Sequence, residues 1–340
     1  MIHYPHVIFI EQKGDQTMKR SYLCLSAILL TLIMLAPSSV PAAGKALRVA
    51  IIAPSAQNDL AFTQSIVDGI KAIQKERPIE LAITDGTFVV EDAAAAIRDY
   101  AKKGFDLVIA HGSQYGGSLK EIAPDFPKTA FAWGTSADTF GLANVSSYEA
   151  ASDEGGYVMG VMAAAMSKKG GVGVVGPVEV GDAKLYVDGF VKGAKAQNPK
   201  IRAKVNYIGS FSDVALAAEA ARALMASGAD VLTGTSQMVV GAIGAARAKR
   251  VPWFATQANQ TELAPEIVVA SQVYKWEVVL KKILADMDKG IKGGKKYKIN
   301  LANNGIVIEF NDGYKLDPKV KELGLKTIAG IKDGSIKTGL

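Results

Sequence analysis

A sequence pattern that occurs twice constrains the fold of this chain more than any other feature. Val67-Asp68-Gly69 recurs as Val187-Asp188-Gly189. Further along, Gly104-Phe105-Asp106-Leu107-Val108 corresponds to Gly228-Ala229-Asp230-Val231-Leu232. The copies lie roughly 120 residues apart, which is too long a period for a solenoid. The repeat therefore predicts two similar domains in tandem.

Within each copy, short β-branched runs alternate with helical segments. This alternation is typical of βα units, whose strands form a parallel sheet covered by helices. We therefore expect an α/β fold with two Rossmann-like lobes. The expected strands are residues 47–52, 81–84, 107–111 and 129–133 in the first lobe, and 172–175, 205–208, 231–235, 253–256 and 267–273 in the second.

The segments between and after the copies predict how the lobes are joined. Residues 43–152 and 274–290 are expected to form the first lobe, and residues 153–273 and 291–340 the second. Residues 300–310 are expected to form a pair of strands. The chain would then cross between the lobes three times, which predicts a hinge rather than a single tether.

The amino-terminal residues predict export. Residues 18–42 resemble a secretory signal peptide, with a basic start, an apolar run and a small-residue cleavage site before Ala43. We expect residues 1–17 to be a mis-called upstream extension and the mature protein to be periplasmic. A membrane anchor is the alternative, but the apolar run is about 14 residues and a spanning helix needs roughly 20. Cys24 lies near the start of that run, so a lipid anchor is not expected.

The residues after position 42 offer little material for catalysis. They contain no cysteine, and their one histidine, His111, is interpreted as structural. The acidic group Glu149, Asp153 and Glu154 is interpreted as hinge hydrogen bonding. No GxSxG, HExxH or Walker A pattern is present. We therefore expect no enzyme activity, no cofactor and no metal site.

The charge of the chain does not predict binding to nucleic acid. Lys and Arg outnumber Asp and Glu by 39 to 33, and much of the excess lies in residues 281–298. That segment contains no arginine, so it is interpreted as a solvated lysine-rich face.

The loops after the strands are the expected ligand-binding segments, because ligands of parallel sheets bind beyond the carboxyl ends of the strands. Their amides, hydroxyls and aromatic rings suit a flat, neutral, hydrogen-bonding ligand better than an ion. Asn58 and Asp59 also suit a helix cap, and Phe62 also suits the core. The candidate residues are Asn58, Asp59, Phe62, Ser113, Gln114, Tyr115, Trp133, Thr135, Thr235, Gln237, Gln257, Asn259, Tyr274 and Trp276.

Several motifs, in order along the chain, resemble the basic membrane protein (BMP) family, the PnrA-like receptors of ABC importers. They include Asn58-Asp59-Leu60-Ala61-Phe62-Thr63-Gln64-Ser65, Asp153-Glu154-Gly155-Gly156-Tyr157 and Tyr207-Ile208-Gly209-Ser210-Phe211-Ser212-Asp213. The resemblance implies a type I periplasmic-binding-protein fold, a purine-type ligand, and permease and ATPase partners. It also implies that Phe62 stacks on the base, while Asn58 or Asp59 hydrogen-bonds to it. We expect a monomer.

The ribose-binding part of the pattern differs from that family. Gln257 and Asn259 stand where the resemblance implies acids, an expected aspartate falls at Thr135, and an expected lysine falls near Tyr274. An amide does not replace a carboxylate that accepts from a ribose diol. A free purine base such as adenine is therefore favoured over a nucleoside, bound between Phe62 and Trp276 from opposite lobes.

Other functions remain open at this stage. The same two-lobed protein could sense a ligand for a membrane receptor, or bind a molecule that is not a purine. A nucleoside hydrolase is less favoured, because it would need a clustered acid, base or metal site.

Overall fold

The computed structural model describes residues 46–340, which contain two six-stranded sheets. The expected upstream extension and signal peptide lie outside the described residues. Every helix of residues 46–340 is too short or too polar to cross a membrane.

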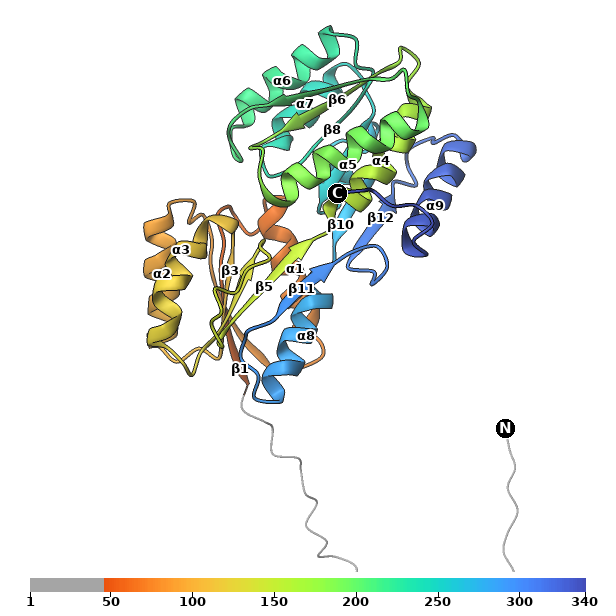
Figure 1. Ribbon diagram of the computed structural model, residues 1–340. Helices are drawn as coiled ribbons and strands as arrows, with labels where there is room; N and C mark the ends of the chain where they lie inside the picture. The colour runs from red at the N-terminus through yellow and green to blue at the C-terminus, as the bar shows by residue number, and fades with distance from the viewer. Residues whose placement is uncertain (1–45) are drawn as a thin grey trace, which may run out of the picture. The chain divides into compact units, whose positions relative to one another are not determined.

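The first sheet has the strand order β11-β5-β4-β3-β1-β2. Helices α1 and α8 cover one face, and α2 and α3 cover the other (Figure 1). The strands are β1 (Leu47–Ile52), β2 (Ile79–Thr84), β3 (Leu107–His111), β4 (Ala130–Gly134), β5 (Val145–Ala150) and β11 (Lys296–Ile299). The helices are α1 (Phe62–Gln74), α2 (Val90–Lys102), α3 (Gly116–Ile122) and α8 (Glu277–Asp288), with short 3-10 turns at Ser113–Tyr115 and Ala123–Asp125.

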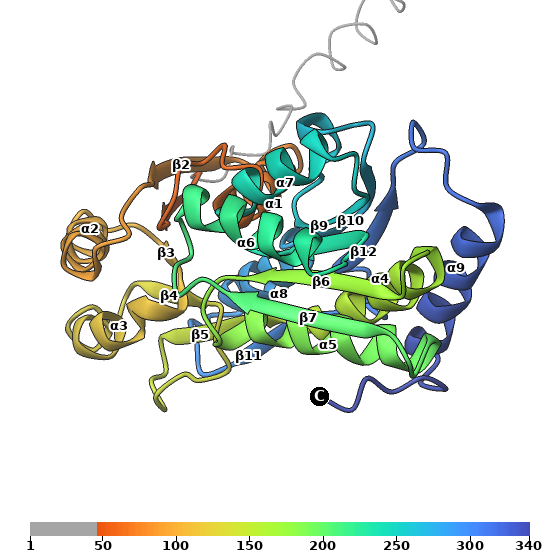
Figure 2. The same ribbon diagram turned by 90° about the horizontal axis from the view of Figure 1, so that it is seen from above.

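The second sheet has the equivalent order, β12-β10-β9-β8-β6-β7. Helices α6 and α7 lie on one face and α4 and α5 on the other (Figure 2), and α9 packs against α4. The strands are β6 (Gly171–Gly176), β7 (Arg202–Tyr207), β8 (Val231–Gly234), β9 (Trp253–Gln257), β10 (Val268–Tyr274) and β12 (Ile306–Phe310). The helices are α4 (Ser152–Met166), α5 (Gly181–Gln197), α6 (Val214–Ala226), α7 (Val239–Ala248) and α9 (Pro318–Lys332), with a 3-10 turn at Thr261–Leu263.

The chain crosses between the sheets three times, as expected: from β5 to β6, from β10 to β11, and from β11 to β12. The repeated glycines explain how the crossing helices dock. A Cβ on Gly69 would meet the backbone of Glu277, where α8 begins, and a Cβ on Gly189 would meet the backbone of Asp153, where α4 begins. Each lobe therefore uses this glycine to receive the first turn of the helix that arrives from the other lobe.

Two expectations about strands were wrong. Residues 300–310 do not form a strand pair, because Asn300 and Asn303 close a turn in which each side chain accepts from the other residue's backbone N–H. The strand before that turn, β11, pairs parallel with β5 and so belongs to the first sheet, although residues 291–340 were assigned to the second lobe. Strand β5 was missed because Ser146 and Ser147 interrupt its apolar pattern, yet both residues are buried.

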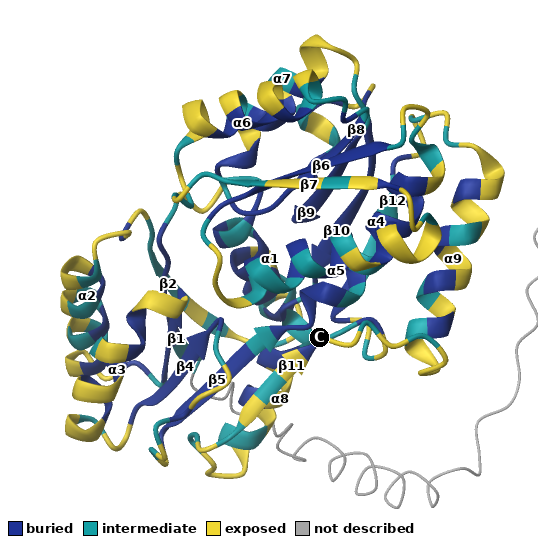
Figure 3. Ribbon diagram, turned by 45° about the horizontal axis from the view of Figure 1, so that its top comes forward, coloured by how far each residue is buried: buried dark blue, intermediate teal, exposed yellow. Residues whose placement is uncertain are grey.

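The buried side chains form separate outer cores and one shared inner core. One outer core lies under α2 and α3 and another under α6 and α7. The inner core contains Ile66 and Trp276 from the first lobe together with Met159 and Phe190 from the second. Figure 3 shows buried strands at the centre of both sheets, with the edge strand β7 partly exposed.

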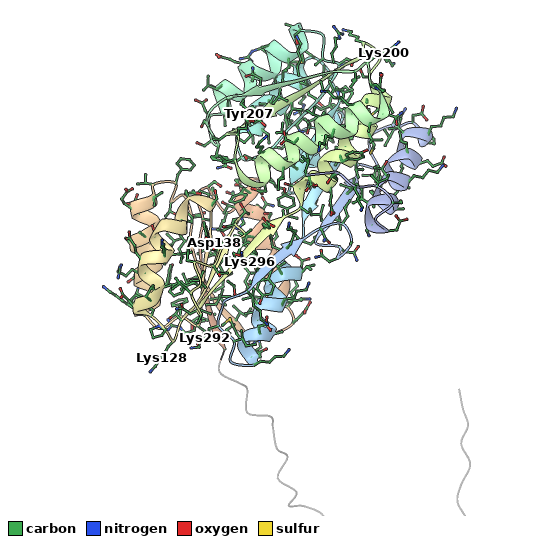
Figure 4. All side chains as sticks on the ribbon, in the orientation of Figure 1. Lys128, Asp138, Lys200, Tyr207, Lys292 and Lys296 are labelled. Atoms are coloured by element: carbon green, nitrogen blue, oxygen red, sulfur yellow. The ribbon has the colours of Figure 1, made fainter. Side chains whose placement is uncertain are left out.

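The strand ends of the second sheet point toward the first lobe. Tyr207 ends β7, and Lys200 lies two residues before β7 begins (Figure 4). The Tyr207 end is the one nearer to the first lobe. Since β6, β8, β9 and β10 run parallel in the same sheet, their carboxyl ends lie on that side as well. This orientation brings the loops of both lobes together.

The acidic group near the lobe junction holds the crossings together. Glu154 of α4 accepts a hydrogen bond from the backbone N–H of Leu301 at 2.7 Å, which joins the first crossing to the third. Glu149 pairs with Lys298 at 2.6 Å. Partial burial raises the pKa of Glu154. These contacts match the interpretation of the group as hinge hydrogen bonding.

Candidate ligand-binding site

A pocket with an empty volume of about 450 Å³, open mouth included, lies between the two lobes. Its lining comes from loops that follow equivalent strands of the two sheets, as expected for ligands of parallel sheets. The first lobe contributes Pro54, Phe62, Phe88, Ser113, Gln114 and Thr135. The second lobe contributes Val180, Gly181, Asp182, Ala183, Phe211, Ser236, Gln237 and Gln257.

Phe62 is half-buried at the start of α1 and is held by His111. The two rings stack with centroids 4.1 Å apart and an angle of 22° between their planes. The Phe62 carbonyl can only accept, so His111 Nε2 donates to it at 3.3 Å, and His111 Nδ1 then accepts from the Tyr148 hydroxyl at 2.8 Å. Burial lowers the pKa of His111 to about 3, which keeps the imidazole neutral. One face of Phe62 therefore rests on a neutral ring, and the residue lines the pocket.

Asp182 brings a carboxylate to the pocket from the second lobe. Its Oδ1 accepts from the Thr135 hydroxyl at 3.1 Å, so the bond joins the two lobes. Its Oδ2 is covered and has no hydrogen-bond partner within residues 46–340. Burial raises the pKa of Asp182 to about 6, against the opposing effects of the Thr135 hydroxyl and of backbone N–H groups at the start of α5.

Gln257 presents a second acceptor to the same pocket. It is 2% exposed, and its Oε1 has no hydrogen-bond partner in the described part of the chain. Its backbone has a φ of 72°, and the φ of Ser236 on the neighbouring loop is 74°. Left-handed backbone is uncommon for residues with a Cβ and concentrates at functional sites. Both residues end or follow strands of the second sheet at the cleft.

The structure brings part of the expected set of site residues together. Phe62, Ser113, Gln114, Thr135, Gln237 and Gln257 line the pocket. Asn58 is exposed beside it. Asp59 instead accepts from the backbone N–H groups of Thr63 and Gln64 at 3.0 Å, so it caps α1. Thr235 is buried behind the lining, at 1% exposure.

The other expected aromatic residues belong to the core. Tyr115 donates to the Thr87 carbonyl at 2.8 Å, and Trp133 donates to the Gly112 carbonyl at 3.1 Å. Trp276 is fully buried and donates to Ser65 Oγ at 2.9 Å. Because Trp276 precedes α8, which crosses back to the first lobe, it lies on the same lobe as Phe62. The expected sandwich of Phe62 and Trp276 from opposite lobes therefore does not form.

Asn259 and Tyr274 line a second space beside α1, and Gln257 borders both spaces. Two of the charged side chains there, Lys275 and Glu309, pair with each other. Asn259 Nδ2 donates to Glu309 at 2.8 Å, and Lys275 forms an ion pair with the same carboxylate at 3.0 Å.

Phe88, Phe211 and Asp182 line the pocket but were not among the candidates. The two phenylalanines occupy equivalent places, in Gly86-Thr87-Phe88 after β2 and Gly209-Ser210-Phe211 after β7. Both glycines have positive φ, 70° and 74°, which turns each loop in the same way. This Gly-x-Phe pattern is a further part of the internal repeat and could have been found in the sequence.

The family model of the PnrA-like ABC transporter substrate-binding proteins matches residues 46–337. The chain belongs to this family. The family consists of receptors for small-molecule substrates, which deliver to the permease and ATPase subunits of ABC transporters. The predicted fold, with two parallel-sheet lobes of the type I periplasmic-binding kind, is confirmed by similar solved structures.

Relatives of this PnrA-like protein include a purine-binding protein from Brucella abortus, 30% identical over 72% of this chain and 69% of that protein. The transcriptional activator protein Med from Bacillus subtilis is 28% identical over 78% of this chain and 83% of its own length. Among solved structures, an ABC transporter solute-binding protein from Conexibacter woesei has a TM-score of 0.72 and 24% identity. That match covers 86% of this chain and 98% of the other.

Proposed function

We propose that this protein is the periplasmic receptor of an ABC importer for a purine base, with adenine favoured. The main support for this proposal is the position of Phe62. Its ring stacks on the neutral His111 ring and lines the pocket between the lobes, and Phe211 lines the same pocket from the opposite lobe. Two aromatic side chains from facing lobes suit a flat heterocycle bound between them. Stacking of a base on a protein aromatic ring contributes about 1–3 kcal/mol.

The charge of the lining supports a base rather than a nucleotide. Among the lining residues Asp182 is the one ionisable group, and there is no Lys or Arg to pair with a phosphate. The free acceptors Asp182 Oδ2 and Gln257 Oε1 instead require N–H or O–H donors. The relatives agree with this class of ligand, since one is named a purine-binding protein and one from Lactococcus lactis a nucleoside-binding protein.

A free base is favoured over a nucleoside because acids implied by the resemblance for ribose binding are amides here. Gln257 is one of them. Asn259 is the other, and it lies outside the pocket with its side chain bonded to Glu309.

The test is parallel calorimetric titration of the mature protein with adenine, guanine, adenosine, guanosine and a hexose. Adenine should bind tightest, and at a hundred times its dissociation constant it should stabilise the protein by roughly 2.7 kcal/mol. Binding of the hexose alone would refute the purine proposal. Tighter binding of adenosine than of adenine would refute the preference for the free base and leave the receptor function standing.

Export and closure belong to the same proposal. We expect a mature amino terminus at Ala43, which the intact mass of the periplasmic protein would show. Ligand should favour a closed arrangement of the lobes and reduce the radius of gyration in small-angle scattering. A retained leader, or an unchanged radius at saturation, would contradict these parts.

A sensor is the second candidate, favoured by the similarity to the transcriptional activator Med. Deletion of the gene should abolish uptake of labelled adenine if the protein is a transport receptor. Normal uptake with altered transcription would favour the sensor.

A further inference from the structure

Asp182 is the second residue of α5, the helix that follows the first strand of the second lobe, β6. Its place resembles that of Asp59, which precedes α1 in the first lobe. The two carboxylates differ in their partners. Asp59 Oδ1 accepts from the N–H groups of Ala61 and Gln64, and Oδ2 accepts from Thr63 N and from Ser55 Oγ. Asp182 accepts one side-chain hydrogen bond, from Thr135 to Oδ1.

Oδ2 of Asp182 indicates what kind of ligand group the pocket can bind. Oδ2 is shielded from solvent without a hydrogen bond from any described residue, although a buried anionic oxygen is costly to leave without a donor. The residue lines the interlobe pocket, where no described lining residue carries a positive charge. A donor on a ligand in the pocket would satisfy this oxygen.

Thr135 distinguishes the two oxygens of Asp182. Its hydroxyl donates to Oδ1 and joins the carboxylate to the first lobe, whereas Oδ2 has no hydrogen bond from a described residue and can accept a charge-assisted hydrogen bond from a ligand. Thr135 is also the position where the resemblance implies an aspartate. The first lobe thus lacks that acid, and α5 of the second lobe brings a carboxylate to the same place.

We propose that Asp182 is the specificity-determining residue of the pocket and selects amino-substituted purines by accepting an exocyclic N–H on Oδ2. This inference rests on the proposed function. An amino group donates to Oδ2, whereas an oxo group at the same ring position would place a lone pair against an anionic oxygen. The carboxylate therefore favours adenine over hypoxanthine, which has nearly the same shape.

The test compares adenine and hypoxanthine on the wild-type protein and on Asp182→Asn by calorimetry. The amide keeps the shape of the side chain but can donate from Nδ2. Asp182→Asn should weaken adenine binding by about ten- to a hundredfold. It should leave hypoxanthine binding unchanged or tighter, so the preference between the bases falls or reverses.

Two control variants separate selection from general binding. Asp59→Asn changes a carboxylate whose two oxygens are already satisfied, so the ratio of adenine to hypoxanthine affinity should stay as in the wild type. Phe62→Ala removes stacking, which does not distinguish the substituents, so both bases should weaken by the same factor. Melting temperatures of all variants without ligand confirm that each is folded.

The outcomes are distinct. Equal weakening of both bases by Asp182→Asn would show that Asp182 only joins the lobes, and unchanged affinity for both bases would likewise overturn the inference. In both cases purine binding by the wild type leaves the proposed function intact. If the wild type binds no purine, the proposed function fails and this inference fails with it.

Discussion

The two lobes share a framework but use the helix after their first strand differently. Both sheets have the equivalent strand order, and in both a glycine of that helix, α1 or α5, receives the crossing helix. In the first lobe, Asp59 is saturated by hydrogen bonds within its own loop and helix. In the second, Asp182 keeps an oxygen that no residue from 46 to 340 reaches with a hydrogen bond. Equivalent parts of the two lobes thus hold acids with different roles. Asp59 is structural and Asp182 is a candidate for ligand binding, and their hydrogen bonds distinguish them.

The aromatic residues show the same asymmetry. Phe62 of the first lobe rests on His111, which the Tyr148 hydroxyl holds in place. Phe211 of the second lobe is half-buried at the tip of a loop. The first lobe therefore offers a fixed stacking surface, and the second offers hydrogen-bond acceptors from Asp182 and Gln257.

The largest expected effect concerns His111, the ring on which Phe62 of the first lobe stacks. Its pKa lies at about 3 in the folded protein, below the ordinary value of 6.5. Its contribution to stability is therefore present above pH 6.5 and is lost as the pH falls toward 3. Between pH 7.5 and pH 4 the free energy of unfolding should decrease by roughly 3 kcal/mol from this residue. Urea unfolding of the wild type and of His111→Gln across this range measures the difference. Parallel pH profiles for the two proteins would contradict it.

The second prediction compares the stacking residues. Phe62→Ala should weaken adenine binding by roughly ten- to a hundredfold, as expected for 1–3 kcal/mol of stacking. Phe211→Ala should weaken it less, because no aromatic ring in the described part of the chain stacks on Phe211. Phe88→Ala is the matched control on the rim, since Phe88 is 47% exposed and should contribute least. An equal loss for Phe62 and Phe211 would show that the lobes share stacking evenly.

The third prediction contrasts the two acids by stability without ligand. Asp59→Ala should destabilise the protein by roughly 1–2 kcal/mol at pH 7.5, because α1 loses its cap. Asp182→Asn should instead stabilise it by at most about 3 kcal/mol above pH 6.

The sign for Asp182 follows from its pKa, which burial raises to about 6 and to which the charge of Glu149 adds. The contribution of Asp182 to the stability of the folded protein is fully present below pH 3.8, the ordinary pKa of an aspartate, and is lost as the pH rises through 6. Asp182→Asn should therefore give no gain below pH 4. Chemical unfolding of the wild type, Asp59→Ala and Asp182→Asn at pH 4 and pH 7.5 measures these changes. A loss of stability for Asp182→Asn at pH 7.5 would contradict the predicted difference between the two acids.

The smallest expected effect concerns the amides. Gln257→Ala should weaken adenine binding by about 1 kcal/mol, or roughly fivefold, as for one neutral hydrogen bond. Gln114 of the first lobe is the matched control, because it lines the pocket but is exposed. Gln114→Ala should leave calorimetric affinity nearly unchanged. A larger effect for Gln114 than for Gln257 would move the hydrogen-bonding role to the first lobe.

Local patterns predicted much of the fold. Alternating βα segments and the repeat were enough for two parallel-sheet lobes and three crossings, because apolar periodicity and glycine positions are properties of neighbouring residues. The exceptions had non-local causes. Strand β5 carries serines that are buried only because β4 and β11 lie on either side of it. Strand β11 is short and lysine-rich, and its partner β5 lies far away in the sequence.

The candidate site was predicted in part for the same reason. Strand ends locate the loops, so Phe62, Thr135 and Gln257 were found from the sequence alone. The large aromatic residues Trp133 and Trp276 were misjudged, because a tryptophan near a strand end suits both a cleft and a core. Only the neighbours of the indole decide between these places.

By itself, the sequence determined the repeat, the βα order and the absence of cysteine from residues 43–340. Tertiary structure decided which polar groups stay free. Asp59 and Asp182 look alike in sequence, each near the start of a helix, and only the fold shows that Thr135 reaches one oxygen of Asp182 and that nothing described reaches the other. Hydrogen-bond satisfaction depends on atoms brought together from distant parts of the chain, so no local pattern can state it.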